Sequence, residues 1–186
     1  MARVSVIDPN TATGEAATLL NAVQAQLGVT PNFIRVLANS PKALEGFLGL
    51  YGAAGGFAVD KATQERIALA VAEGNGCQYC VSAHTAIGRH AGLSNDEMQL
   101  NRRGTSSDAK AAAAVAFAKV LNDNLGEVTT AEFDSALSAG LTDGEIVEII
   151  AVVALNIFTN VLGKATRVEI DFPKVDLMDA RLMAAA

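Results

Sequence analysis

Apolar and polar residues along the chain are grouped in stretches of helical composition, separated by glycine, proline and short polar loops. We expect longer helices over residues 11–27, 41–55, 60–72, 77–90, 108–124 and 142–164, with short ones after residues 30, 94 and 129. No stretch shows the apolar/polar alternation bounded by turn residues that is typical of a half-buried strand. The pattern predicts an all-α protein.

Capping residues mark several of the expected helix starts. Thr30-Pro31 and Ser40-Pro41 each place an N-cap hydroxyl before a proline in the first helical position. Ser94, Thr129 and Thr142 are each followed three residues later by glutamate, which is the capping-box signature. These five positions predict where five helices begin.

Two helices carry an unusual surface. Gly46, Gly49 and Gly52 recur on one side of the helix over 41–55, which favours close approach of a neighbouring backbone over a frayed or bent helix. The run over 149–162 is the most apolar of the chain, but at 14 residues we expect it to be too short to cross a membrane. We expect the apolar tail after Val168 to dock on the fold or on a neighbouring subunit. Together these features predict a homo-oligomer.

Composition narrows the class of protein. Hydrophobic residues make up 51% of the chain and aromatic residues only 5%, so small side chains fill the interior, which suits packed helices. With 14 basic and 20 acidic residues the net charge is −6, which argues against a nucleic-acid partner. No signal peptide is visible at the N-terminus, and we expect a cytoplasmic protein. Two cysteines in that compartment suggest redox or metal chemistry.

Reactive side chains are concentrated between Glu65 and His84, which hold both cysteines and one of the two histidines. Gly74 and Gly76 interrupt the preceding helix, so the motif from Cys77 to Cys80 lies at the start of a new one. Unpaired N–H groups and the positive end of the helix dipole stabilise a thiolate there.

Helical spacing brings three of these side chains together. At about 100° per residue, Cys77, Cys80 and His84 fall within an arc of about 60°. An imidazole one turn beyond Cys80 can accept its proton and raise the thiolate fraction near neutral pH. Glu65 can pack back against them from the preceding helix as a further proton acceptor, or it can lie solvated beside Lys61. Tyr79 points away from all of them. Glu73, at the end of the helix that carries Glu65, is a weaker candidate for a direct role.

Two other interpretations of the cysteine pair remain. The spacing C-x2-C-x3-H-x5-H also suggests a zinc site, although His90 lies about 140° from Cys77 on a continuous helix. Two inert buried thiols are the other alternative. A redox pair is favoured over both.

At these residues the chain resembles the alkyl hydroperoxidase D-like (AhpD-like) branch of the carboxymuconolactone decarboxylase superfamily. The resemblance rests on Glu65, the Asn-Gly-Cys-x-Tyr-Cys core at 75–80 and His84, and it extends to the stretch 156–160. It implies one helical domain over residues 1–186, with a core motif at 58–103 and a tail at 168–186. It also implies an oligomer, trimeric or hexameric, that needs no cofactor or metal.

The same resemblance assigns roles to four residues of a thiol peroxidase. Cys80 matches the peroxidatic cysteine, Cys77 the resolving cysteine, His84 the base and Glu65 the acidic member of a proton relay. Because Cys77 lies at the helix start, we expect it to be more exposed than Cys80 and to meet the external reductant. The partners implied are a hydroperoxide substrate and an external dithiol reductant, with no membrane or nucleic acid. Tyr79 replaces a histidine of the best-studied pattern, which puts a relay through that position in doubt.

Two alternatives belong to other functional classes. A lactone decarboxylase or related activity needs a pocket base and would survive loss of both cysteines. A redox-sensing or zinc-stapled helical oligomer would have no enzymatic activity.

Overall fold

The computed structural model describes residues 2–178. Within this part the chain forms helices and no strand, as predicted. The helices, in chain order, are α1 Gly14–Leu27, α2 Asn32–Leu37, α3 Pro41–Ala54, α4 Lys61–Gly74, α5 Gln78–His90, α6 Asn95–Arg102, α7 Ala109–Asp123, α8 Thr130–Ser138 and α9 Asp143–Thr166.

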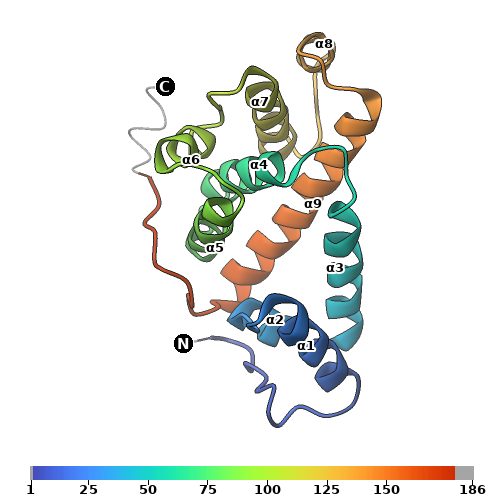
Figure 1. The fold of residues 1–186 in the computed structure, drawn as a ribbon, viewed down its shortest axis with the longest axis vertical. Coiled ribbons are helices and arrows are strands. Elements are labelled where there is room, and N and C mark those ends of the chain that lie inside the picture. Colours follow the sequence, from blue (N-terminus) through green and yellow to red (C-terminus); the bar gives the residue numbers. More distant parts are fainter. Residues whose placement is uncertain (1, 179–186) are drawn as a thin grey trace.

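Helix α4 is the centre of the arrangement (Figure 1). It packs against α5, α6, α7 and α9, and almost all of its side chains from Thr63 to Glu73 are buried. Asp60 caps its start by accepting a hydrogen bond from the Thr63 N–H at 2.8 Å. A helix buried on every side forms the rigid support for whatever side chains it presents.

Two large apolar cores form around this helix, beside a small third one of Leu69, Leu93 and Met98. One joins α1, α2 and α3 to the start of α5, and includes Leu20, Leu44 and both cysteines. The other joins α4, α7, α8 and α9, and includes Val115 and Ile149. The cysteine pair is therefore part of a packed core.

Most capping predictions are confirmed. Ser40 accepts from the Ala43 N–H, and Thr129 and Thr142 each form a complete capping box. Ser94 caps α6, but the reciprocal hydrogen bond expected between the Glu97 side chain and the Ser94 N–H is not formed. The Glu97 carboxylate instead binds side chains of α4 and α6 and the loop after α6, namely Arg66, Asn101, Ser106 and Ser107.

The predicted cap of α2 is also wrong. Its N-cap is Pro31, and the Thr30 hydroxyl donates to Gln24 instead. The first N–H groups of α2 are satisfied by distant residues: the Asn32 N–H donates to Asp171 at 2.6 Å, and the Phe33 N–H to the hydroxyl of Tyr79 at 3.2 Å.

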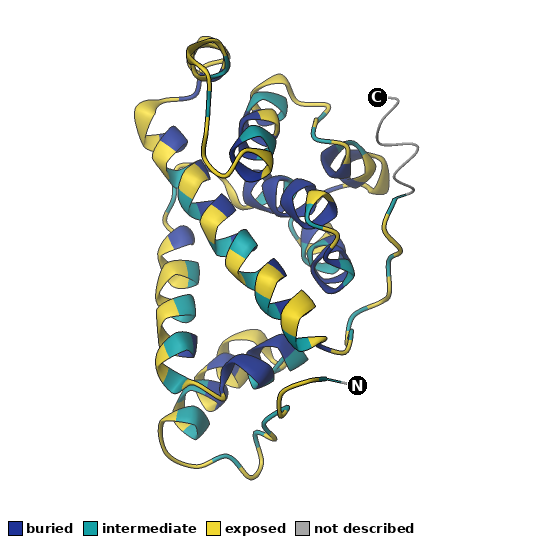
Figure 2. Cartoon of the chain, turned by 180° about the vertical axis from the view of Figure 1, so that it is seen from behind, coloured by how far each residue is buried: buried dark blue, intermediate teal, exposed yellow. Residues whose placement is uncertain are grey.

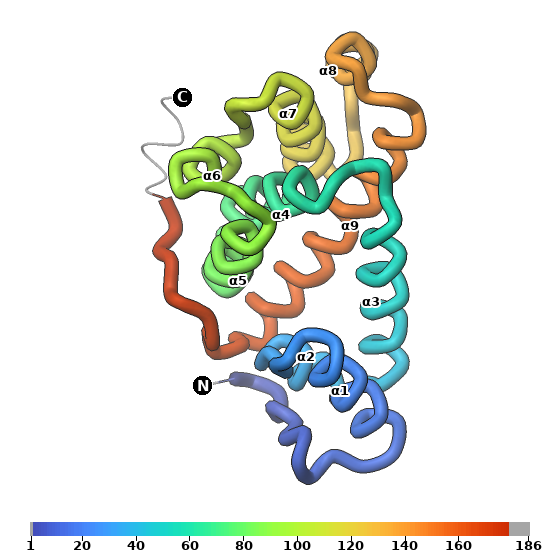
Figure 3. The backbone as a smooth tube through the Cα atoms, in the orientation of Figure 1, coloured from blue at the N-terminus to red at the C-terminus, as the bar shows by residue number. Residues whose placement is uncertain are grey.

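The segment that follows α9 docks on its own chain. It leaves the end of α9 beside the N-terminal segment and runs past α5 towards α6 (Figure 3). The Val175 N–H donates to Ser82 of α5, and the Met178 N–H donates to Glu73 of α4. A docked tail was expected, and up to residue 178 it contacts its own subunit; residues 179–186 lie outside the described part.

The close approach expected at the glycines of α3 is not made by the described part of this chain. At Gly46, Gly49 and Gly52 an added Cβ would meet no atom within 4 Å, so no element within residues 2–178 packs against them. This side of α3 and one face of α9 are exposed (Figure 2).

The apolar run 149–162 is part of the longer helix α9. With 24 residues, α9 passes a membrane-span test on length and composition alone, and a core helix passes the same test. The expectation that this segment is too short therefore does not hold for the helix as a whole. In the structure α9 packs against α3, α4, α5 and α7.

Candidate active site

The two cysteines meet where α4 ends and α5 begins. Cys77 is the N-cap of α5, as predicted, and Gly76 takes a positive φ of 62° in the turn before it, a conformation that favours glycine. Cys77 and Cys80 form a disulfide across a Cα–Cα distance of 5.3 Å. The pair packs against the α9 backbone at Gly163, where an added Cβ would lie 3.5 Å from Cys77 Sγ. This geometry allows a reversible dithiol–disulfide couple.

His84 and Glu65 are directly hydrogen-bonded. The sequence suggested only that Glu65 packs near the imidazole. His84 Nδ1 lies 2.7 Å from Glu65 Oε2, and Lys61 Nζ lies 2.8 Å from the other carboxylate oxygen. The Glu65 carboxylate therefore contacts both the imidazole of His84 and the ammonium of Lys61, which lies one turn earlier on α4.

The carboxyl group of Glu65 is held in its ionised form. Burial alone would raise its pKa, but the charges and hydrogen bonds of His84 and Lys61 outweigh burial, and the pKa lies below its usual value. Burial lowers the pKa of Lys61, but its contact with Glu65 raises it by more. When the ring is neutral, a carboxylate on Nδ1 favours the tautomer with the proton on Nδ1, which leaves Nε2 as an acceptor.

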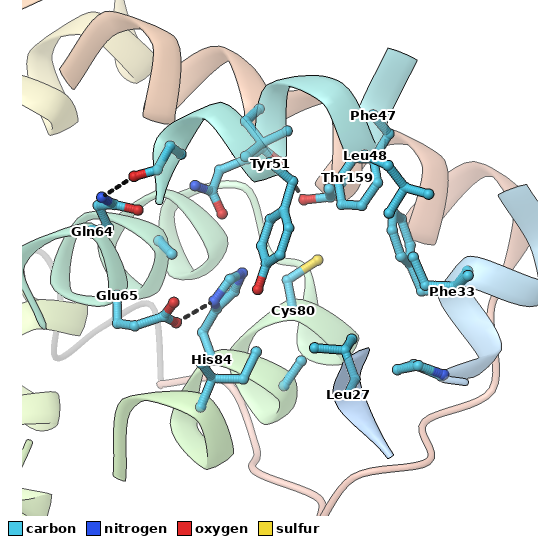
Figure 4. A pocket seen from close by; sticks show the side chains of 18 of the residues that line it. Leu27, Phe33, Phe47, Leu48, Tyr51, Gln64, Glu65, Cys80, His84 and Thr159 are labelled. Carbon is cyan, nitrogen blue, oxygen red and sulfur yellow. Dashed lines mark hydrogen bonds and ion pairs between the residues drawn. The ribbon is translucent and has the colours of Figure 1, made fainter. Parts of the chain in front are cut away.

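A cavity of about 150 Å³ opens beside the sulfur atom of Cys80. Cys80, His84 and Glu65 all line it, whereas Cys77 does not. In Figure 4 the second ring nitrogen of His84 points away from Glu65 into this space, towards Tyr51. The remaining lining is mainly apolar and aromatic, and includes Leu27, Phe33, Phe47, Leu48, Ile87 and Phe172.

Comparison with known proteins finds a similar family. Residues 41–123 match the model of the carboxymuconolactone decarboxylase family. A peroxidase-related protein of uncharacterised function from Ralstonia eutropha JMP134, described as an alkylhydroperoxidase AhpD core, is 25% identical with a TM-score of 0.78, over 91% of this chain and 92% of that one. The chain is therefore similar to the carboxymuconolactone decarboxylase family over residues 41–123, and its fold is AhpD-like.

Other solved structures share the fold of this AhpD-like protein. A peroxidase-related protein of uncharacterised function from Silicibacter sp. TM1040 has a TM-score of 0.79 at 24% identity, over 90% of this chain and 91% of that one. A cysteine-to-alanine variant of the debrominase Bmp8, in complex with 2,3,4-tribromopyrrole, has a TM-score of 0.74 at 19% identity, over 100% and 98%. No curated protein sequence matches the chain.

Tyr79, the departure from the best-studied AhpD pattern, has a structural partner. Its hydroxyl donates to Asp171 at 2.9 Å and accepts from the Phe33 N–H. Burial raises the pKa of the Tyr79 phenol, and the neighbouring carboxylate of Asp171 raises it further. Its ring lines the cavity although its hydroxyl is turned to the tail.

The structure also corrects several expectations. Cys77, expected to be the more exposed cysteine, is 1% exposed against 3% for Cys80. Glu73, considered for a direct role, pairs with Arg102 at 2.6 Å and does not line the cavity. His90 is exposed, with Nδ1 2.9 Å from the Ala86 carbonyl oxygen of its own helix.

The two amides of α9 have different surroundings. Asn156 lines the cavity and donates to the Val152 carbonyl, whereas Asn160 accepts from Asn75 in the turn before Cys77. Within residues 2–178 no group of three or more His, Cys, Asp or Glu side chains could hold a metal ion.

Sequence reasoning missed two residues of the AhpD-like site. Lys61 was considered only as a surface partner of Glu65, although its i, i+4 spacing was a usable signal. Tyr51 had no signal, because α3 reaches the cavity only through tertiary packing.

Proposed function

We propose that this AhpD-like protein is a thiol-dependent peroxidase that reduces hydroperoxides through Cys80 and Cys77. The observation that carries the proposal is that Cys80, alone of the two cysteines, lines an apolar cavity beside a His84 ring bonded to Glu65. Cys77, which does not line the cavity, forms a disulfide with Cys80.

In the first step the reduced Cys80 gives its proton to Nε2 of His84 and attacks the terminal oxygen of the hydroperoxide. An S–O bond forms as the O–O bond breaks, so sulfur loses two electrons and the peroxide gains them. The alkoxide leaves with a proton from His84, which yields an alcohol and a Cys80 sulfenic acid. Glu65 stabilises the imidazolium formed on the way.

In the second step the Cys77 thiol condenses with the sulfenic acid, forming the disulfide and releasing water. An external dithiol then attacks the disulfide and restores both thiols. Because Cys80 lines the cavity and Cys77 does not, the mixed disulfide with the reductant is expected on Cys80. This replaces the initial expectation that Cys77 meets the reductant.

Single cysteine variants test this function. Cys77→Ser should consume about one equivalent of hydroperoxide per subunit and accumulate a trappable sulfenic acid on Cys80, because condensation is blocked. Cys80→Ser should do neither. The measurement is peroxide titration of the reduced proteins with a sulfenic-acid trap and mass spectrometry. Full turnover by both variants would exclude peroxidase chemistry at this pair, and the opposite pattern would reverse the two roles.

A second candidate is reductive dehalogenation of a small aromatic compound. The aromatic side chains Phe33, Phe47 and Phe172 around Cys80 favour it, and so does the fold shared with the debrominase Bmp8. The dithiol would supply two electrons, releasing halide and the reduced ring and forming the disulfide. Halide release from 2,3,4-tribromopyrrole, with no consumption of hydroperoxide, would favour this candidate.

A decarboxylase activity would survive in a variant lacking both cysteines.

A further inference from the structure

Tyr51 reaches the reacting groups from the opposite wall of the cavity. It extends from α3, and Figure 4 shows its hydroxyl end pointing towards the His84 ring and Cys80. Lys61 connects the two walls, since its Nζ lies 5.3 Å from the centre of the Tyr51 ring and 2.8 Å from Glu65. Tyr51 is therefore within the same small group of side chains as His84 and Glu65.

Two neighbours fix the orientation of the Tyr51 ring. Phe47, one turn earlier on α3, stacks on it with centroids 5.7 Å apart and planes at 20°. The ammonium of Lys61 lies over the ring, in the geometry of a cation–π contact. A hydroxyl on a ring held in this way has a defined position and loses little entropy when it binds a substrate atom.

The Tyr51 hydroxyl has no hydrogen-bond partner among residues 2–178, which distinguishes it from the other tyrosine. The hydroxyl of Tyr79 donates to Asp171 and accepts from Phe33, so it is fully used. In a cavity with a mainly apolar lining, a free phenol is a donor available to a bound molecule.

We propose that Tyr51 is a further catalytic residue, whose hydroxyl donates a hydrogen bond to the oxygen that leaves when Cys80 is oxidised. This inference rests on the proposed peroxidase function. As the O–O bond breaks, negative charge develops on the leaving oxygen, and the proton from His84 neutralises it only as transfer is completed. A neutral donor on the opposite wall stabilises that charge without competing with Cys80 for the base.

The test separates the peroxide step from thiolate formation in the same protein. Tyr51→Phe keeps the stack on Phe47 and the face for Lys61, and removes only the hydroxyl. We expect its second-order rate constant for oxidation by cumene hydroperoxide to fall about 100- to 1,000-fold, in line with loss of one transition-state donor. Its alkylation by iodoacetamide should stay at the wild-type rate, because no oxygen leaves in that reaction.

The oxidation and alkylation rates of Tyr51→Phe, each relative to wild type, decide the role of Tyr51. Slower oxidation with unchanged alkylation supports the role. Equal oxidation rates in Tyr51→Phe and wild type overturn it and leave the peroxidase function standing, whereas slower alkylation means that Tyr51 acts on the thiol rather than on the leaving oxygen. A wild-type protein that is alkylated but oxidised by no hydroperoxide would overturn both proposals. Thermal unfolding of Tyr51→Phe identifies a loss of activity that is caused by misfolding. In that case Tyr51→Trp, whose indole N–H is a donor, provides the second comparison.

Discussion

His84 connects the chemistry of the site to its support. One ring nitrogen is held by the buried carboxylate of Glu65, and the other faces the space beside Cys80. Since Glu65 is itself held by Lys61, the orientation of the imidazole is fixed from α4, the most buried helix of the fold. This arrangement gives a base whose position does not depend on a mobile loop.

Replacement of His84 should therefore change the acidity of the thiol. We expect reduced His84→Phe to be alkylated about 10-fold or more slowly near pH 7, with a pH profile moved up towards the ordinary thiol pKa of about 8.5. Iodoacetamide kinetics between pH 5 and about pH 10 measure both effects. The matched control is His90→Phe, which removes the exposed histidine at the end of α5 and should behave as wild type. Unchanged alkylation in His84→Phe would mean that the helix N-terminus alone sets thiolate character.

At the scale of elements, the tail after α9 joins two helices that build the cavity. The carboxylate of Asp171 accepts from the Asn32 N–H at the start of α2 and from the Tyr79 hydroxyl on α5. It thus caps a short helix that has no side-chain cap of its own, and it satisfies a buried phenol. Phe172, the next residue, lines the cavity and packs edge-on against Tyr79 at 5.8 Å.

Loss of this carboxylate should destabilise the fold. Asp171→Ala leaves the Tyr79 hydroxyl and the start of α2 without their acceptor, and we expect the free energy of unfolding to fall by about 1–3 kcal/mol. Urea unfolding followed by circular dichroism gives the value. Asp134→Ala, at an exposed position of α8, should change it by less than about 0.5 kcal/mol. Equal effects of the two substitutions would show that the tail contact contributes nothing measurable.

The helix starts show which elements a sequence can predict. Ser40, Thr129 and Thr142 cap through residues three positions later, so the signal is local and the predictions are confirmed. The partner of the α2 N-terminus is 139 residues away along the chain, and no local pattern contains it. The sequence therefore predicted the nearby Thr30 as the cap of α2, whereas Asp171 in the tail accepts the hydrogen bond from its first N–H.

The same difference between local and distant contacts applies to the candidate site. The cysteines and His84 share one helix, so helical periodicity is enough to bring them together, and Glu65 follows from the motif. Tyr51 and the apolar wall come from α1, α2 and α3, whose approach to α5 depends on packing between distant segments. The relative exposure of Cys77 was wrong for this reason: a position at a helix start looks exposed until α9 and the tail are placed against it.

At the scale of the whole molecule, α9 leaves an apolar face uncovered. Val147 and Val161 are 65% and 60% exposed, and Ile150 and Phe158 lie between them on the same face. The glycines of α3 likewise face open space, and both surfaces are visible together in Figure 2. Exposed apolar residues grouped in this way are typical of an interaction surface, and a second copy of the chain is the partner that we propose.

Self-association through this face is the last prediction. We expect light scattering at micromolar concentration to give the mass of a trimer or a hexamer, because association removes the apolar face of α9 from water. The double substitution Val147→Glu and Val161→Glu places charges on that face and should lower the mass. Leu125→Glu is the matched control: Leu125 is 90% exposed, but it lies in the loop after α7, so its replacement should leave the mass unchanged. A monomeric wild type would contradict the prediction, and an oligomer that survives the double substitution would assign the interface to another face.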